Sequence, residues 1–199
     1  MDSPAQQNLV REFRRIAASR HRAIQARCAR LNVLPSVVRV FAPGTAEVIR
    51  CWLQDLSLGD LGNVNSRVGY ERWYFARLDE LHTLVAPLNE RNARVHPGLK
   101  WGHCHKVLCL FMTDVVVNFR CLGDEAKSRM EPWLFAAIDG VVMKRLSSLG
   151  FRLPADAIKR IDTESKFWWF QVTLREAAES ASAAPIWFDD NWGLRDDLT

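Results

Sequence analysis

The sequence lacks the features of secreted and membrane-spanning proteins. Its N-terminus has no basic segment followed by an apolar core, which a secretory signal requires. Its longest apolar run, Val107–Met112, is much shorter than the roughly 20 residues that cross a bilayer. We therefore expect a soluble, cytoplasmic protein without a membrane partner.

Paired cysteines and the common nucleotide and catalytic motifs are also missing. The five cysteines lie within apolar helical patterns and show no disulfide or zinc-site spacing, so we predict reduced thiols that mostly pack in the core. There is no phosphate loop, dinucleotide fingerprint, nucleophile elbow or Cys-x-x-Cys. No cofactor and no metal are predicted, and whether the protein is an enzyme stays open. The cysteines are Cys28, Cys51, Cys104, Cys109 and Cys121.

Strand signals are few. The β-branched runs Val37–Phe41 and Val115–Val117 adjoin helical patterns, and no second run offers a pairing partner at hairpin spacing. The chain has 199 residues, an ordinary globular composition, no repeat and no long linker. These features predict one all-α domain over residues 1–199, a compact bundle of six or seven helices.

Apolar spacing and turn residues place the individual helices. The longest apolar pattern, Leu99–Phe119, is expected at the centre of the bundle, and the aromatic tail Ile186–Trp192 is expected to pack back onto it. Ser57–Gly69, rich in glycine and asparagine, is predicted to be a loop. Further helices are predicted at about 4–31, from Thr45, over Tyr70–Ala86 with Pro87 as its end, from Glu131 to Leu149, and from Thr163.

The predicted first helix is strongly basic. The first 32 residues carry seven arginines against two acidic residues, a net charge of +5, whereas the whole chain has +4. One group of arginines falls within a sector of about 100°, opposite the apolar side chains, while Arg20 and Arg27 project near the apolar side. Such a stripe suits phosphate groups, although an ordinary solvated helix face is the alternative. The stripe consists of Arg11, Arg14, Arg15 and Arg22, opposite Phe13, Ile24 and Leu31.

The central pattern contains two polar groups of residues. His105 and Cys109 have the i, i+4 spacing of two metal ligands, but no further Cys/His pair completes a tetrahedral set. We favour a hydrogen-bonded core histidine beside a core thiol. The other group shares a sector of about 140° and either faces solvent or lines an internal groove. Its members are His103, Lys106, Thr113, Asp114 and Asn118.

The window Arg91–His96 resembles the signature of the HEPN class of helical ribonucleases, an arginine followed four to six residues later by a histidine. The resemblance implies metal-independent RNA cleavage. Arg91 would orient the phosphate, and His96 would act as general acid or base.

Two further segments resemble an uncharacterised family of small helical bacterial proteins. Members carry a Trp-Gly-Gln-Ala-Gln-Lys-like start to an apolar helix and a Pro-Leu-x-Phe-Glu-like C-terminal stretch followed by tryptophan. Here Trp101–Lys106 keeps the tryptophan, glycine and lysine but has histidine in place of both glutamines, and Pro185–Asp189 with Trp192 resembles the second stretch. The resemblance implies a bacterial helical domain and adds Lys106 to the candidate phosphate-binding residues.

Three functions are consistent with these patterns. The first is a non-enzymatic bacterial protein that binds nucleic acid or a phosphorylated ligand, in a defence or mobile-element setting. The second is a structural or assembly protein, in which exposed tryptophans contact a protein partner or a second copy. The third is the HEPN-like ribonuclease.

Overall fold

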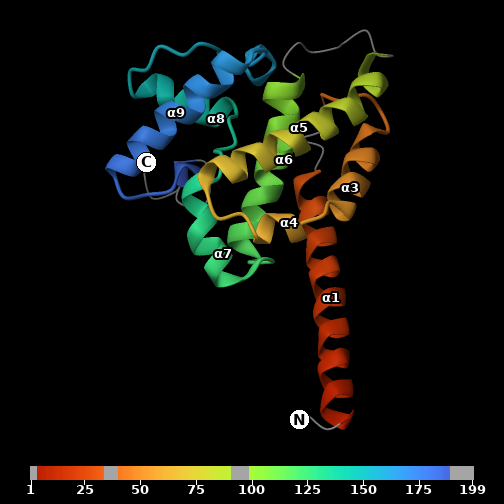
Figure 1. The fold of residues 1–199 in the computed structure, drawn as a ribbon. Coiled ribbons are helices and arrows are strands. Elements are labelled where there is room, and N and C mark those ends of the chain that lie inside the picture. The colour runs from red at the N-terminus through yellow and green to blue at the C-terminus, as the bar shows by residue number, and fades with distance from the viewer. Residues whose placement is uncertain (1–3, 34–39, 91–98, 189–199) are drawn as a thin grey trace, which may run out of the picture.

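The computed structural model describes residues 4–33, 40–90 and 99–188 (Figure 1). Regular structure in these ranges is entirely helical, which confirms the all-α prediction. The α-helices are α1 (Pro4–Asn32), α3 (Thr45–Asp55), α4 (Gly59–Gly62), α5 (Arg67–Glu90), α6 (His105–Thr113), α7 (Gly123–Met130), α8 (Gly140–Ser148) and α9 (Glu164–Ser180). The π-helical segments η1 (Leu99–Cys104) and η2 (Asp114–Asn118) flank α6, and η3 (Glu131–Trp133), η4 (Ile158–Arg160) and η5 (Pro185–Phe188) are short 3₁₀ turns.

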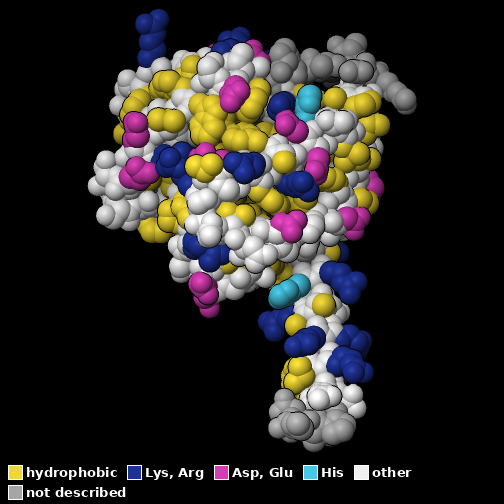
Figure 2. Space-filling model, viewed as in Figure 1, with side chains coloured by type: hydrophobic (Ala, Val, Ile, Leu, Met, Phe, Trp, Pro, Cys, Tyr) yellow, Lys and Arg dark blue, Asp and Glu magenta, His cyan; other side chains and the backbone are white. Residues whose placement is uncertain are grey.

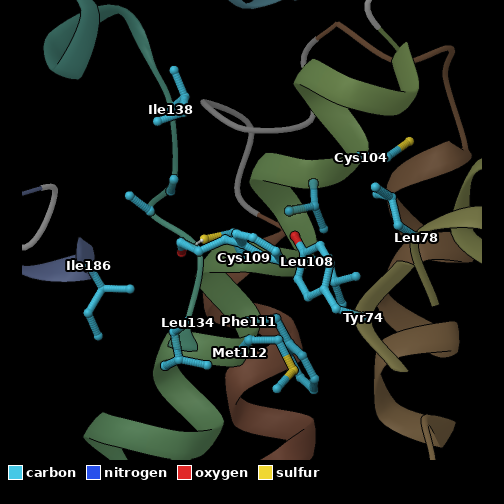
Figure 3. Packing of buried hydrophobic residues seen from close by; sticks show 14 of the residues in the cluster. Tyr74, Leu78, Cys104, Leu108, Cys109, Phe111, Met112, Leu134, Ile138 and Ile186 are labelled. Atoms are coloured by element: carbon cyan, nitrogen blue, oxygen red, sulfur yellow. Dashed lines mark hydrogen bonds between the residues drawn. The ribbon is translucent and has the colours of Figure 1, made fainter. Parts of the chain in front are cut away.

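The segment formed by η1, α6 and η2 is the central helix. Its side chains are buried on nearly every side, as expected for a helix that is apolar all round. Figure 3 shows Leu108 beside Tyr74 of α5, while Leu134 and Ile186 approach from the other side of α6. The predicted central position of Leu99–Phe119 is therefore correct.

Gly102 in η1 is required by close packing. A Cβ at this position would lie 2.3 Å from the carbonyl oxygen of Ile158 in η4 and 2.9 Å from its Cγ2. Only a residue without a side chain allows η4 to approach so closely.

Two predicted boundaries are wrong. Pro87 does not end α5, which continues to Glu90. Buried Asn89 holds the last turn, because its side chain donates to the Val85 carbonyl (2.7 Å) and accepts from the Ala42 N–H (2.8 Å). The predicted loop Ser57–Gly69 contains α4, whose Leu61 is fully buried, and the start of α5.

The predicted helix from Glu131 to Leu149 is also wrong. After the turn η3, residues 134–138 run through the core in an irregular conformation, and α8 begins only at Gly140. The side chains of all five residues are buried, whereas an amphipathic helix would expose part of such a run. Asp139 then caps α8, since its Oδ1 accepts from the N–H groups of Val141 (2.8 Å) and Val142 (3.1 Å).

The aromatic end of the described chain packs on the body through η5. Ile186 is buried, whereas Trp187 is about half exposed and donates its Nε1–H to Glu131 (2.8 Å). Trp168 and Trp169 on α9 are partly buried against the core. Trp192 lies outside the described residues.

Helix α1 covers its predicted range of about 4–31 and projects far from the body (Figure 1). Among the described elements, α3 and the central helix pack against its C-terminal part. There Cys28 is buried, Gln25 donates to the carbonyls of Leu53 and Leu56 (2.9 and 2.8 Å), and Asn32 donates to Asp114 (2.8 Å). None of the helices in the described ranges combines the length and the apolarity needed to cross a bilayer.

Candidate phosphate-binding arm

The part of α1 formed by residues 6–23, here called the arm, is exposed along its whole length. At 1.5 Å per residue it extends for about 27 Å. Its one acidic residue, Glu12, forms an ion pair with Arg15 one turn later (2.6 Å). Arg15 lowers the pKa of the Glu12 carboxyl by donating hydrogen bonds to it. On the face seen in Figure 2, Lys/Arg and hydrophobic side chains share the arm.

The structure brings the four arginines of the predicted stripe together on this arm. All four are exposed, and helical geometry places them within one sector of about 100°. Arg11, Arg14 and Arg22 form no ion pair with a described residue, so no carboxylate in the described ranges compensates their charges. The stripe therefore offers guanidinium groups on one side of a freely accessible helix.

The same side of the helix contacts the body further along α1. Gln25, Ala29 and Asn32 fall in the sector of the stripe, and these residues pack on or hydrogen-bond to the body. Arg22 is common to the stripe and to a hollow of about 530 Å³ at the base of the arm, where His21 and Gln25 face the α3–α4 connection. The acidic residue Asp55 also lines the hollow, and its negative charge disfavours an anion there. Phosphate binding is thus expected along the arm rather than deep in the hollow.

The opposite side of the arm is apolar and exposed. In the predicted compact bundle, this face of the first helix would be buried. In the structure, Leu9, Phe13 and Ile16 are 50–63% exposed. The described body leaves these side chains largely exposed, and its nearest part is the loop after η2, which lines a hollow together with Phe13 and Ile16.

His105 and Cys109 belong to a hydrogen-bonded network in the core, as favoured from the sequence. The Nδ1 of His105 lies 2.8 Å from the hydroxyl of Tyr74, and its Nε2 lies 3.2 Å from the carbonyl oxygen of Ala136. Both contacts are satisfied when Nε2 carries the proton and Tyr74 donates to Nδ1. Burial lowers the pKa of His105 to about 4, so the ring is neutral at physiological pH. The Sγ of Cys109 donates to the Phe135 carbonyl.

Gln171 of α9 completes this network, and sequence reasoning did not assign it a role. Its side-chain amide accepts from the Ala136 N–H (3.1 Å) and donates to the Ala136 carbonyl (3.0 Å), so it pairs with the irregular segment as a neighbouring strand would. Its position, as a lone glutamine on the apolar face of the predicted helix, could have indicated a structural role. A buried amide needs hydrogen-bond partners, so such a residue is expected to pair with another element. The network supports the fold and is not accessible to a large ligand.

Lys106 lies in the body and not on the arm. Its Nζ contacts the Asp139 carboxylate at 3.0 Å, and both side chains are at most 18% exposed. Other members of the predicted polar stripe also have internal contacts: His103 is buried with its ring edge-on to Phe41, and Asp114 accepts from Asn32 and Asn118. The polar stripe is therefore mostly used for packing between elements.

Arg91 and His96 lie outside the described residues, so the structure does not test the HEPN-like pair. All five cysteines are free thiols, of which only Cys51 is exposed. In the part of the chain that the structure describes, no group of three or more His, Cys, Asp or Glu side chains is arranged to hold a metal ion. Comparison with protein-family models, with characterised proteins and with solved structures finds no match to this chain.

Proposed function

We propose that the protein binds nucleic acid through the arm, with phosphate groups held by its arginine stripe. The observation that carries the proposal is the accumulation of four exposed guanidinium groups on one side of a helix that projects from the body, next to a single carboxylate. Arginine gives phosphate oxygens charge-assisted, bidentate hydrogen bonds, which lysine cannot reproduce. The residues are Arg11, Arg14, Arg15 and Arg22.

The dimensions of the arm fit a nucleic-acid backbone. From Arg11 to Arg22 the helix rises about 16 Å, a length over which duplex DNA presents several phosphates per strand. An α-helix about 10–12 Å wide also fits the DNA major groove, which is about 12 Å wide. Contacts from the stripe to phosphate oxygens would position the protein on the backbone and carry no sequence information by themselves.

The direct test measures binding to a short DNA duplex and to a single-stranded RNA. Fluorescence anisotropy at low salt gives the affinities. Replacement of the four stripe arginines by glutamine is expected to weaken binding about 100-fold or more, because most of the affinity comes from phosphate contacts. A matched control replaces four exposed cations of the body by glutamine and so makes the same change in net charge. The control residues are Lys144, Arg152, Lys159 and Arg160.

The control variant is expected to bind nearly as well as the wild type. Equal weakening of both variants would mean that net charge, and not the stripe, governs binding. Absence of binding by the wild type to either nucleic acid at low salt would contradict the proposal.

A further inference from the structure

The apolar side of the arm forms a continuous stripe. Its side chains fall within a sector of about 120° and lie opposite the arginines. The largest, Phe13, is 63% exposed. An apolar face that the described part of the chain leaves largely exposed is typical of helices that pair with another helix. The stripe consists of Leu9, Val10, Phe13, Ile16 and Ala17.

The stripe leads into a second hollow at the base of the arm. This hollow has a volume of about 460 Å³ and lies between α1 and the loop after η2. The helix lines it with Phe13, Ile16, Ala17 and Ile24 together with Arg20 and His21, and the loop lines it with Phe119, Arg120 and Cys121. An apolar helix lying along the arm would therefore meet further apolar side chains, together with Arg20 and Arg120, where the arm joins the body.

We propose that the occupant of this surface is the arm of a second copy of the chain, paired in antiparallel orientation about a two-fold axis near Phe13. In this register Leu9 of each copy faces Ala17 of the other, and the N-terminal end of each arm approaches the hollow of its partner. The interface is self-complementary, as two-fold symmetry requires. The pairing is a property of the apolar side and does not depend on nucleic-acid binding.

The charges on the arm are compatible with a second arm as the occupant and favour the antiparallel orientation. Pairing through the apolar sides directs the two arginine stripes outward, so that they are separated by roughly two helix diameters, about 20 Å. This separation exceeds the screening length of about 8 Å at physiological salt, so repulsion between the stripes is small. A parallel pair would bring Arg20 of one arm against Arg20 of the other, whereas the antiparallel pair keeps these two residues at opposite ends.

The size of the arm sets the expected strength of pairing. A single helix of about 27 Å offers less than the roughly 800 Å² per partner that a standard interface buries. We therefore expect a reversible dimer that forms in the micromolar range or above, and not an obligate one.

Sedimentation velocity over concentrations from about 1 to 200 μM tests the pairing, since this range spans the dissociation constants of weak complexes. The wild type is expected to shift from monomer to dimer, and Phe13→Asp with Ile16→Asp is expected to stay monomeric. The matched control, Val68→Asp with Leu149→Asp, changes two equally exposed apolar residues of the body (62% and 65%) and is expected to dimerise. A wild type that stays monomeric up to the highest concentration, or a Phe13/Ile16 variant that still dimerises, would overturn the proposal.

Cysteine cross-linking tests the orientation. In a Cys51→Ser background the remaining native thiols are buried, so new surface thiols can be followed alone. A mixture of Leu9→Cys and Ala17→Cys proteins is expected to form a disulfide-linked heterodimer under mild oxidation by glutathione disulfide, while Leu9→Cys alone gives little cross-linked product. Efficient cross-linking of Leu9→Cys alone would indicate parallel arms and contradict the proposed register.

The two proposals can fail separately. The variant with four glutamines in the arginine stripe is expected to dimerise like the wild type, because its apolar side is intact. Added salt is expected to leave dimerisation unchanged or to strengthen it slightly, whereas it weakens binding to nucleic acid. Dimerisation that weakens steeply with salt would contradict pairing through the apolar side.

Discussion

The imidazole of His105 is buried, uncharged and hydrogen-bonded on both nitrogens, which makes it a source of acid sensitivity. Its pKa is about 4 in the folded protein and 6.5 in an exposed histidine. Between these values the unfolded chain binds more protons than the folded one, so the free energy of unfolding decreases as the pH falls. The contribution is fully present above pH 6.5 and is lost progressively toward pH 4, by about 3 kcal/mol in total.

We predict that His105→Asn removes this part of the pH dependence. Urea unfolding between pH 7 and pH 4.5 is expected to show a smaller loss of stability in the variant than in the wild type, whatever their relative stability at neutral pH. Parallel pH profiles of the two proteins would show that His105 does not titrate in this way.

Gly102 allows the close approach of η4 to η1. Gly102→Ala is expected to destabilise the protein by about 2 kcal/mol or more, because the new Cβ would overlap backbone atoms of Ile158 and force η4 to shift. Gly140→Ala is a suitable control, since nothing lies within 4 Å of a Cβ at that position. Thermal unfolding of the two variants gives the comparison, and equal stability would contradict the close approach of η4.

At the scale of the elements, the irregular segment 134–138 is held by the side chain of Gln171, which forms two hydrogen bonds with the backbone of Ala136. Gln171→Leu is expected to cost about 3 kcal/mol, because the buried N–H and carbonyl of Ala136 would both lose a partner. The neighbouring exposed substitution Val172→Leu serves as a control on the same helix. If chemical denaturation gives the same stability for both variants, the segment is held by packing alone.

The elements with a simple amphipathic or fully apolar pattern could be predicted from the sequence. Thr163 was correctly identified as the cap of α9, where its Oγ1 accepts from the Lys166 N–H (3.4 Å). The errors occur where tertiary contacts override local signals: Asn89 stabilises the turn that follows Pro87, and Gln171 provides partners for a segment with a helix-like composition. Such contacts join residues 35 to 47 positions apart, which local pattern analysis does not detect.

For the candidate site, the sequence predicted the grouping of the arginines but not their setting. Helical periodicity alone places Arg11, Arg14, Arg15 and Arg22 in one sector. It does not tell whether the body covers the opposite, apolar side, because burial depends on where neighbouring helices end. The structure adds that residues 6–23 extend beyond the body and that both sides of the arm are accessible.

At the scale of the whole molecule, the fold separates a packed body from a projecting cationic arm. In the body, the buried residues Asn89, His105, Asp139 and Gln171 are hydrogen-bonded, whereas the arm carries five arginines and one glutamate and has little contact with other described elements. This division is consistent with a body that supports the arm and an arm that contacts partners. The arginine side would bind nucleic acid, and the apolar side would bind the second arm.

The salt dependence of nucleic-acid affinity tests the central claim most directly. Each phosphate contact contributes a slope of about −0.9 to a plot of log affinity against log salt on duplex DNA, so four arginines predict a slope of about −3 to −4. The variant with glutamine at positions 11, 14, 15 and 22 is expected to show a slope shallower by about 3, and the body control a slope close to that of the wild type. Equal slopes for the wild type and the stripe variant would show that these arginines do not contact phosphates and would contradict the proposed function.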